Sequence, residues 1–215
     1  MTGEGYRFLA HLPALKDLGL CIENPVVADI AYQHVGRCQG LTTLNLNQSE
    51  GTQAGFDQLA PLTNLTFLDV GDCGITNLGF LSGMQRLEKL IVSSNQIHDS
   101  DLLNLNCHTT LKQLSLANTG VTDGCGPILS QFHDLEDILI SRTNITDAIL
   151  PYLLSLPKLI SLAIWDTKLT PDCVRYLKGM TQLHHLMLPK GLLSDAEWES
   201  LQKSLDRTRL SEVKW

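Results

Sequence analysis

Leucine and other aliphatic residues follow one spacing along almost the whole chain. The pattern L-x-x-L-x-L, with valine or isoleucine allowed, occurs eight times, and a ninth, degenerate copy closes the sequence. The copies begin at Leu15, Leu41, Leu65, Leu87, Leu111, Leu135, Leu159, Leu183 and Leu210. Successive copies are 26, 24, 22, 24, 24, 24, 24 and 27 residues apart. This fixed period predicts a repeat architecture, with residues 1–215 forming a single domain.

Each repeat is predicted to contain a strand, a turn and a helix. The last two apolar positions of L-x-x-L-x-L alternate with outward positions, which is the period of a strand with one buried face. A Thr/Ser/Asp cluster then follows an apolar anchor, as in the Thr122-Asp123 pair. Such residues cap helix N-termini, and Pro171 suits a first helical position. Helices are therefore predicted over 148–158 and 172–182.

The chain resembles the leucine-rich repeat family over essentially its whole length. The family consensus L-x-x-L-x-L-x-x-N/C-x-L is met most closely by LEKLIVSSNQI from Leu87 and LTFLDVGDCGI from Leu65. The ninth position holds Cys73, Asn95, Thr119, Thr143 and Thr167. A side chain there can hydrogen-bond to the backbone where the chain leaves the strand. Threonine at this position, with the ITD-type segment after it, resembles a bacterial subgroup and the cysteine-containing, F-box-associated subgroup.

Stacking these repeats predicts a curved α/β solenoid of about eight to nine repeats. One repeat cannot bury its leucine face alone, whereas stacked repeats bury a continuous core. Parallel strands about 4.8 Å apart would line the concave face, and thicker helices would line the convex face, so the array curves. The third repeat, 65–86, is two residues short and predicts a tight 3₁₀-like segment in place of a full helix.

The last repeat, 183–215, is predicted to cap the C-terminal end of the solenoid. Its charged helix places Trp198, Leu201 and Leu205 on one stripe, which we expect to pack on the preceding repeat. Trp215 falls on an inward strand position and is expected to seal the core. This capping repeat would shield core residues that the end of a solenoid otherwise exposes.

The N-terminal segment, 1–14, has two interpretations. It is either an N-terminal cap, with a short helix from about Tyr6 to Ala10, or the end of a preceding repeat in a longer protein. A solenoid end needs a cap, and no charged cap precedes the first strand. We favour the second interpretation.

Composition narrows the class of protein. The 215 residues include 41 leucines, roughly double the ordinary usage, and the formal net charge is -7. No apolar run approaches the roughly 20 residues that a membrane span needs, and no signal peptide is visible. An acidic chain without a basic patch is a poor candidate for nucleic-acid binding. We expect a cytoplasmic monomer that binds neither membranes nor nucleic acid.

The six cysteines are widely spaced. None lies closer than 17 residues to another, and there is no C-x-x-C pair to suggest a zinc ribbon or a redox motif. We expect free and mostly buried thiols in a reducing compartment. A disulfide between neighbouring repeats is the alternative.

The sequence contains no recognisable catalytic constellation. It has no G-x-S-x-G, no H-E-x-x-H and no phosphate-binding glycine loop. His184 and His185 are adjacent, but strand alternation directs neighbouring side chains apart, which disfavours joint metal binding. We expect no enzyme activity, no metal and no cofactor. A Cys–His nucleophile pair assembled across repeats is the alternative.

Outward strand positions carry two apolar groups on a face that should be exposed to water. Phe67 and Ile91 lie diagonally on adjacent strands, and each alone is consistent with ordinary surface exposure. Leu139, Trp165 and Met187 form the second group, in repeats six to eight. An apolar centre with a charged rim is the composition of an interaction hot spot. The predicted partner-binding residues are Leu139, Trp165, Met187, Arg142, His185, Asp166, Phe67 and Ile91.

The predicted function is a non-catalytic protein–protein interaction module that binds its partner through the concave face. That face of a solenoid is extended, rigid and free of loops. It also carries several outward acids, so a partner with basic and apolar groups would fit. The alternative is the substrate-recognition portion of a larger protein, such as a ubiquitin-ligase-type adaptor or a bacterial effector. This alternative rests on the N-terminal segment and on the resemblance to the F-box-associated subgroup.

Overall fold

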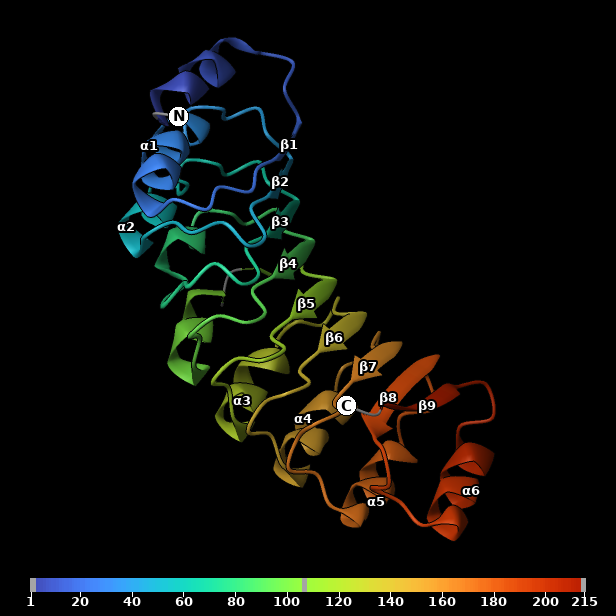
Figure 1. Cartoon of the computed structure of the whole chain (residues 1–215). Coiled ribbons are helices and arrows are strands. Elements are labelled where there is room, and N and C mark those ends of the chain that lie inside the picture. The colour runs from blue at the N-terminus through green and yellow to red at the C-terminus, as the bar shows by residue number, and fades with distance from the viewer. Residues whose placement is uncertain (1–2, 106–107, 214–215) are drawn as a thin grey trace.

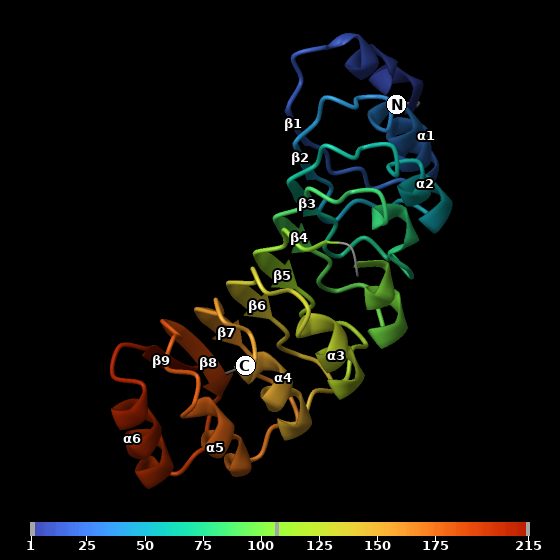
Figure 2. The ribbon, with the colours of Figure 1, turned by 180° about the vertical axis from the view of Figure 1, so that it is seen from behind.

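Parallel strands form the inner wall of a curved coil. The computed structural model describes residues 3–105 and 108–213. Within them, nine strands form one sheet in sequence order, from β1 to β9. Figure 1 shows the strands along the inside of the arc and the helices along its outside, and Figure 2 shows the same arrangement from behind. The predicted α/β solenoid is confirmed.

The elements are short and recur in every repeat. The strands are β1 (Asp17–Gly19), β2 (Thr43–Asn45), β3 (Phe67–Asp69), β4 (Lys89–Ile91), β5 (Gln113–Ser115), β6 (Asp137–Leu139), β7 (Ser161–Ala163), β8 (His185–Pro189) and β9 (Arg209–Val213). The α-helices are α1 (Pro25–Val35), α2 (Gln53–Asp57), α3 (Gly126–Leu129), α4 (Leu150–Leu154), α5 (Val174–Leu177) and α6 (Asp195–Ser204). The 3₁₀-helices are η1 (Gly3–His11), η2 (Gly79–Leu81), η3 (Asp99–Leu105), η4 (Asp123–Cys125), η5 (Asp147–Ile149) and η6 (Pro171–Cys173). None of the helices in the described ranges is long and apolar enough to cross a membrane.

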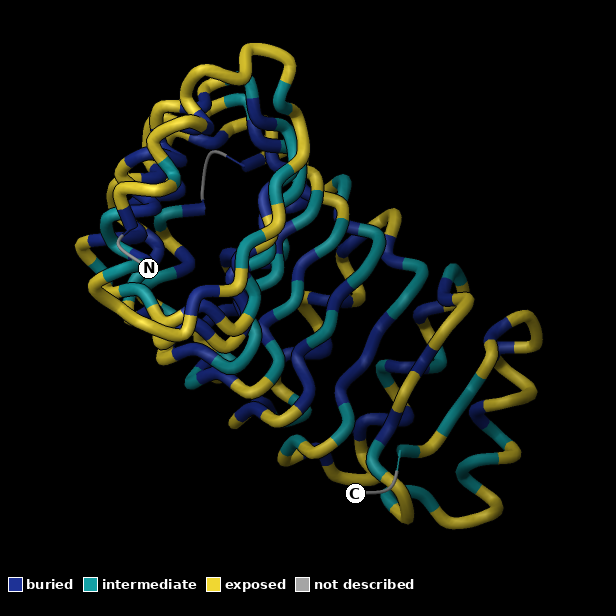
Figure 3. Tube along the Cα trace, turned by 45° about the horizontal axis from the view of Figure 1, so that its top comes forward, coloured by how far each residue is buried: buried dark blue, intermediate teal, exposed yellow. Residues whose placement is uncertain are grey.

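The apolar residue at position four of each repeat sets the register of the sheet. These residues lie opposite one another from strand to strand: Leu18, Leu44, Leu68, Leu90, Leu114, Ile138, Leu162, Leu186 and Leu210. All are buried except those of the two outermost strands. Since strand side chains alternate between faces, positions three and five of each repeat point to the concave side. The strands β3 to β7 consist of buried and half-buried residues, and Figure 3 shows many exposed residues at the outer bends of the chain.

The turns after β2 to β7 each use a left-handed residue that the sequence did not predict. Position eight has a φ of 51° to 61° in six consecutive repeats, at Gln48, Asp72, Ser94, Asn118, Arg142 and Asp166. This conformation costs a non-glycine residue about 1–2 kcal/mol. The side chain at position nine then bonds to the backbone, as predicted. For example, the hydroxyl of Thr119 donates to the Leu116 carbonyl oxygen at 2.6 Å, and that of Thr143 donates to the Ile140 carbonyl oxygen at 2.6 Å.

Threonine caps begin the outer segments and also link neighbouring repeats. Thr146 caps η5, with its hydroxyl oxygen accepting a bond from the Ala148 N–H. Its own N–H and hydroxyl donate to the Asp123 carboxylate of the preceding repeat, at 2.9 and 2.6 Å. The same pair of bonds joins Thr52 to Asp29, Thr122 to Asp99, and Thr170 to Asp147. The predicted caps are confirmed, and a carboxylate of the preceding repeat bonds to each of these four threonines.

The outer helices are shorter than predicted. The segment 148–158 is not one helix, because η5 passes into α4, which ends at Leu154. Likewise 172–182 is replaced by η6 and by α5, which ends at Leu177. The chain must return to the next strand within 24 residues, and buried Leu156 has to enter the core on the way. The 3₁₀ segment predicted for the short third repeat is present as η2.

The predicted C-terminal stripe packs on the core. Leu201 and Leu205 are buried and Trp198 is partly buried against the core. Ser194 and Glu197 form a reciprocal capping box at the start of α6. Trp215, expected to seal the core, lies outside the described residues.

The N-terminal segment forms η1, which packs on α1. Leu9 is buried in the core, and Tyr6 is partly buried against it. The helix expected near residues 6–10 is therefore part of a 3₁₀-helix over Gly3–His11.

Buried His108 is expected to make the stability of the fold depend on pH. His108 is fully buried, with its Nε2 3.0 Å from the Leu81 carbonyl oxygen. Burial lowers the pKa of His108 below its ordinary value of 6.5. The folded state therefore favours the neutral imidazole of His108. The contribution of this neutral side chain to stability is complete above about pH 6.5 and is lost as the pH falls below that value. The equivalent position in neighbouring repeats holds apolar residues, Met84 and Phe132.

We expect His108→Met to flatten this dependence. Urea unfolding measures the free energy of unfolding at pH 7 and at pH 5. The decrease from pH 7 to pH 5 should be larger in the unmodified chain than in the variant. The Leu81 carbonyl oxygen also accepts a bond from the Met84 N–H, so the substitution does not leave it without a donor. Equal losses in the two proteins would show that His108 does not govern the acid response.

Candidate functional site

Large and small side chains alternate along one row of the concave face. Position five of successive strands, from β4 to β8, holds Ile91, Ser115, Leu139, Ala163 and Met187. The three large residues are half-buried or exposed, although the face around them is open to water. The row is therefore a series of apolar ridges separated by low positions.

The second predicted apolar group is brought together by three neighbouring strands. Leu139 on β6 and Met187 on β8 flank Ala163 on β7, because all three occupy the same register. Trp165 lies two residues beyond Ala163, on the same side of the chain by strand alternation. Met187 is 38% exposed, and Leu139 and Trp165 are half-buried. This surface patch of Leu139, Trp165 and Met187 is called the apolar patch below.

Charged residues border the apolar patch. The Arg142 guanidinium lies 5.8 Å from the centre of the Trp165 ring, within cation–π distance. Its Nε is also 3.9 Å from the Asp166 carboxylate, so one cation contacts both predicted residues. His185 is exposed at position three of the eighth repeat, where β8 begins, two residues before Met187 of the patch. The predicted rim is therefore present on the concave face and the turns beside it.

Phe67 and Ile91 occupy separate surroundings. They lie diagonally, because Phe67 is opposite Lys89 and Asp69 is opposite Ile91. The Lys89 ammonium lies 5.5 Å from the centre of the Phe67 ring, so the two side chains cover each other in part. Ile91 instead lines a depression that Phe67 does not reach. The structure does not unite these two residues into one patch.

A depression of about 360 Å³ lies at the middle of the concave face. Ile91 and Leu139 form its two walls and Ser115 lies between them. On its floor, the hydroxyl oxygens of Ser93 and Ser115 are 2.5 Å apart. The depression connects Ile91 with Leu139, although the sequence predicts them in two separate groups. The sequence signal that could have found it is the large–small–large series along position five.

Some residues predicted to point outward are buried. Ala163 at position five is 8% exposed, and Ser141 at position seven is fully buried. Ala163 is small and stands between Leu139 and Met187, which rise above it on both sides. Ser141 occupies the same row as Trp165, one repeat earlier. Both side chains therefore have little or no exposed surface of their own, although strand alternation places them on the outward side.

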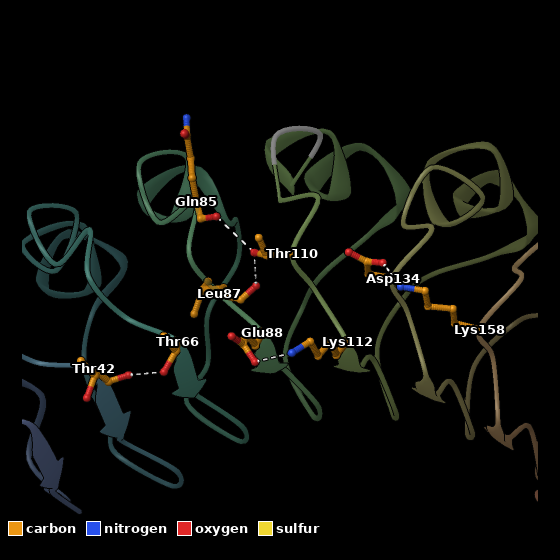
Figure 4. A network of polar contacts seen from close by, with 9 residues as sticks. All are labelled: Thr42, Thr66, Gln85, Leu87, Glu88, Thr110, Lys112, Asp134 and Lys158. Carbon is orange, nitrogen blue, oxygen red and sulfur yellow. Dashed lines mark hydrogen bonds and ion pairs between the residues drawn. The ribbon is translucent and has the colours of Figure 1, made fainter.

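Two charge pairs lie at the edge where the chain enters β4 to β7, and Figure 4 draws both. The Lys112 ammonium is 2.8 Å from the Glu88 carboxylate, and the Lys158 ammonium is 2.5 Å from the Asp134 carboxylate. The hydrogen bond from Lys158 lowers the pKa of Asp134. Because these charges already have partners, and because exposed pairs of this kind contribute little, the edge is a weaker candidate for recognition than the apolar patch.

Most of the thiols in the described residues are buried. Cysteines 21, 38, 73, 125 and 173 are free, as predicted, and all but Cys21 are buried; Cys107 lies outside the described residues. Burial raises the pKa of Cys73, Cys125 and Cys173 to about 12, which keeps these thiols protonated. The described residues also hold no group of three or more histidine, cysteine or acidic side chains placed to bind a metal.

Comparison with known proteins gives matches at the level of structure. No protein-family model matches the chain, and no curated protein matches it. Among solved structures, internalin C2 from Listeria monocytogenes is 20% identical with a TM-score of 0.73, over 95% of this chain and 84% of that one. TLR13, in its complex with ssRNA13, is 20% identical with a TM-score of 0.63, over 88% of this chain and 30% of that one. With its nine-stranded parallel sheet and repeated L-x-x-L-x-L motif, the chain folds as a leucine-rich repeat solenoid.

Proposed function

We propose that this protein is a non-catalytic module that binds a protein partner through its concave face. The observation that carries the proposal is the apolar patch, where three large side chains remain accessible on the open side of a rigid sheet. An apolar centre containing tryptophan, bordered by arginine and histidine, has the composition of a protein-binding hot spot. The partner-binding residues proposed here are Leu139, Trp165, Met187, Arg142, His185 and Asp166.

A protein partner is favoured over nucleic acid. TLR13 is matched in a complex with ssRNA13, so this fold accommodates an RNA ligand in at least one protein. Phosphate contacts require clustered lysine and arginine. This chain has a net charge of -7, and Arg142, a cation beside the apolar patch, already contacts the Asp166 carboxylate. We therefore propose a protein ligand for this chain and no nucleic acid.

The proposed setting is a reducing, cytoplasmic compartment, with the chain acting as a monomer. The free thiols of the described cysteines support this setting, since oxidising compartments favour disulfides. A binding role without catalysis is supported by the buried, protonated thiols, because the thiolate is the nucleophilic form.

A single charge on each face of the solenoid tests the proposal. Met187→Asp introduces a carboxylate into the apolar patch, and we expect partner recovery from a native lysate to fall on the order of tenfold. The matched control is Leu103→Asp on the outer face, where Leu103 is 56% exposed in η3. Recovery should be unchanged by this control. If Leu103→Asp abolished capture and Met187→Asp did not, the outer face would be the binding surface.

A further inference from the structure

The depression over Ser115 has a geometry that selects one kind of bound segment. At position five of the repeat, every second strand from β4 to β8 carries a large residue: Ile91, Leu139 and Met187. Adjacent strands are about 4.8 Å apart, so these ridges are about 9.6 Å apart along the solenoid. The low positions between them, Ser115 and Ala163, have the same separation. A segment lying across the strands must place side chains at this spacing to enter both low positions.

An α-helix matches this spacing and an extended chain does not. Residues seven apart on a helix face are separated by about 10.5 Å along its axis, within about 1 Å of the ridge spacing. Same-face residues of an extended chain are about 6.6 or 13.2 Å apart, so they miss the ridge spacing by about 3 Å or more. From Ile91 to Met187 the row crosses four strand spacings, or about 19 Å. This distance is short enough for a straight helix to stay in contact with the curved surface.

Two charges of opposite sign border the depression and indicate what should flank the apolar side chains. Lys89 and Asp137 line it from β4 and β6, with Gln113 between them on β5. Within the described part of the chain, neither Lys89 nor Asp137 belongs to an ion pair. They stand two strands apart, which is the same separation as the ridges. A bound helix can therefore meet both charges with one acid and one base about two turns apart.

We propose that the concave face from β4 to β8 binds an amphipathic α-helix of a protein partner, lying across the strands. Apolar residues at seven-residue spacing enter the low positions over Ser115 and Ala163. An acid of the helix pairs with Lys89 and a base pairs with Asp137. This inference rests on the proposed function, because it specifies the partner segment for the surface that contains the apolar patch.

The test uses displayed peptides of defined shape. One library presents amphipathic helices of about five turns with varied charges, and a second presents helix-blocked, proline-containing extended peptides with alternating apolar residues. The full chain should enrich helices with apolar residues seven apart, flanked by one acid and one base. Enrichment of extended peptides instead, or of no peptide from either library, would overturn the proposal.

Substitutions then assign the binding to the depression. Ser115→Leu fills it and should weaken the best helical peptide by at least tenfold, whereas Asn45→Leu, in the same row on β2, should leave binding within about twofold. Thermal unfolding of both variants confirms that they are folded; if Ser115→Leu does not fold, Ser115→Thr serves as the smaller obstruction. Binding that Ser115→Leu leaves intact would overturn the proposal.

Charge variants test the acid and the base separately. A helix can bind in either direction, so a peptide with one acid and one base could simply reverse to suit a charge variant. The informative peptides therefore carry two acids or two bases at the flanking positions. Lys89→Glu should shift preference to the two-base peptide, and Asp137→Lys should shift it to the two-acid peptide, each by roughly tenfold. Unshifted preferences would overturn the charge assignment.

Two further outcomes would overturn the inference as a whole. A dimer of the chain that depends on Ser115 would identify a second copy as the occupant. If partner capture from the lysate depends on Met187 but neither library yields a helical binder, this inference fails and the proposed function stands.

Discussion

Replacing Asn95 with alanine is expected to lower the free energy of unfolding by about 3–5 kcal/mol. Asn95 is 5% exposed and occupies position nine of the fourth repeat. Its side chain makes five backbone hydrogen bonds of 2.8 to 3.2 Å. The partners are the N–H groups of Cys73 and Ile75 and the carbonyl oxygens of Val70, Val92 and Ser93. Alanine leaves several of these buried groups without a partner, and each costs about 1–3 kcal/mol.

Two companion variants make this prediction specific. Asn95→Thr should lose less stability than alanine, because Thr119 and Thr143 bond to the backbone at the same position of their own repeats. Gln96→Ala, at the exposed neighbouring position, should stay within about 0.5 kcal/mol of the unmodified chain. Urea unfolding measures all three. An alanine variant within about 1 kcal/mol of the parent would contradict the role given to this side chain.

Replacing Trp165 with alanine is expected to weaken the partner complex by about 30-fold or more. Truncating a tryptophan hot spot costs at least about 2 kcal/mol of binding free energy, and about 1.4 kcal/mol corresponds to a tenfold change in Kd. The ring is half-buried in the free protein and sits under the Arg142 guanidinium. A partner that covers this surface would remove the remaining exposed area of the indole from water.

Phe67→Ala is the matched comparison for that substitution. Phe67 is also a half-buried aromatic residue on the concave face with a cation over its ring, but it lies outside both the apolar patch and the depression. Its truncation should change the Kd by no more than about threefold. Calorimetric titration of the captured partner measures both values. Equal losses at the two positions would mean that binding is spread along the face rather than centred on the apolar patch.

The strands and their register could be predicted because one repeated pattern determines them. Leu44, Leu90 and Leu162 each had to be inward, and a one-residue slip would have turned every such leucine to water. The left-handed residue at position eight could not be predicted. Its positions include Arg142 and Gln48, which carry no local preference for that backbone, so the conformation is imposed by the turn and not by the residue.

The apolar patch was also predictable, but its boundaries were not. Alternation places Leu139, Trp165 and Met187 on one face, and the structure brings them to neighbouring strands. Whether an outward residue remains accessible depends on the side chains beside it, as buried Ala163 shows. The depression was missed for the same reason. It arises where small Ser115 stands between two large neighbours, which is a property of three strands and not of one repeat.

The central claim is that the concave face meets the partner, and oxidative footprinting tests it most directly. Met187 and Tyr152 have nearly equal exposure, 38% and 37%, but Met187 lies on β8 of the concave sheet and Tyr152 on outer helix α4. Methionine oxidation rises with the exposure of the side chain, so the modification of each residue is compared with and without the partner. We predict that adding the captured partner protects Met187 and Trp165 and leaves the modification of Tyr152 unchanged. Protection of Tyr152 with unchanged oxidation of Met187 would contradict the concave-face account.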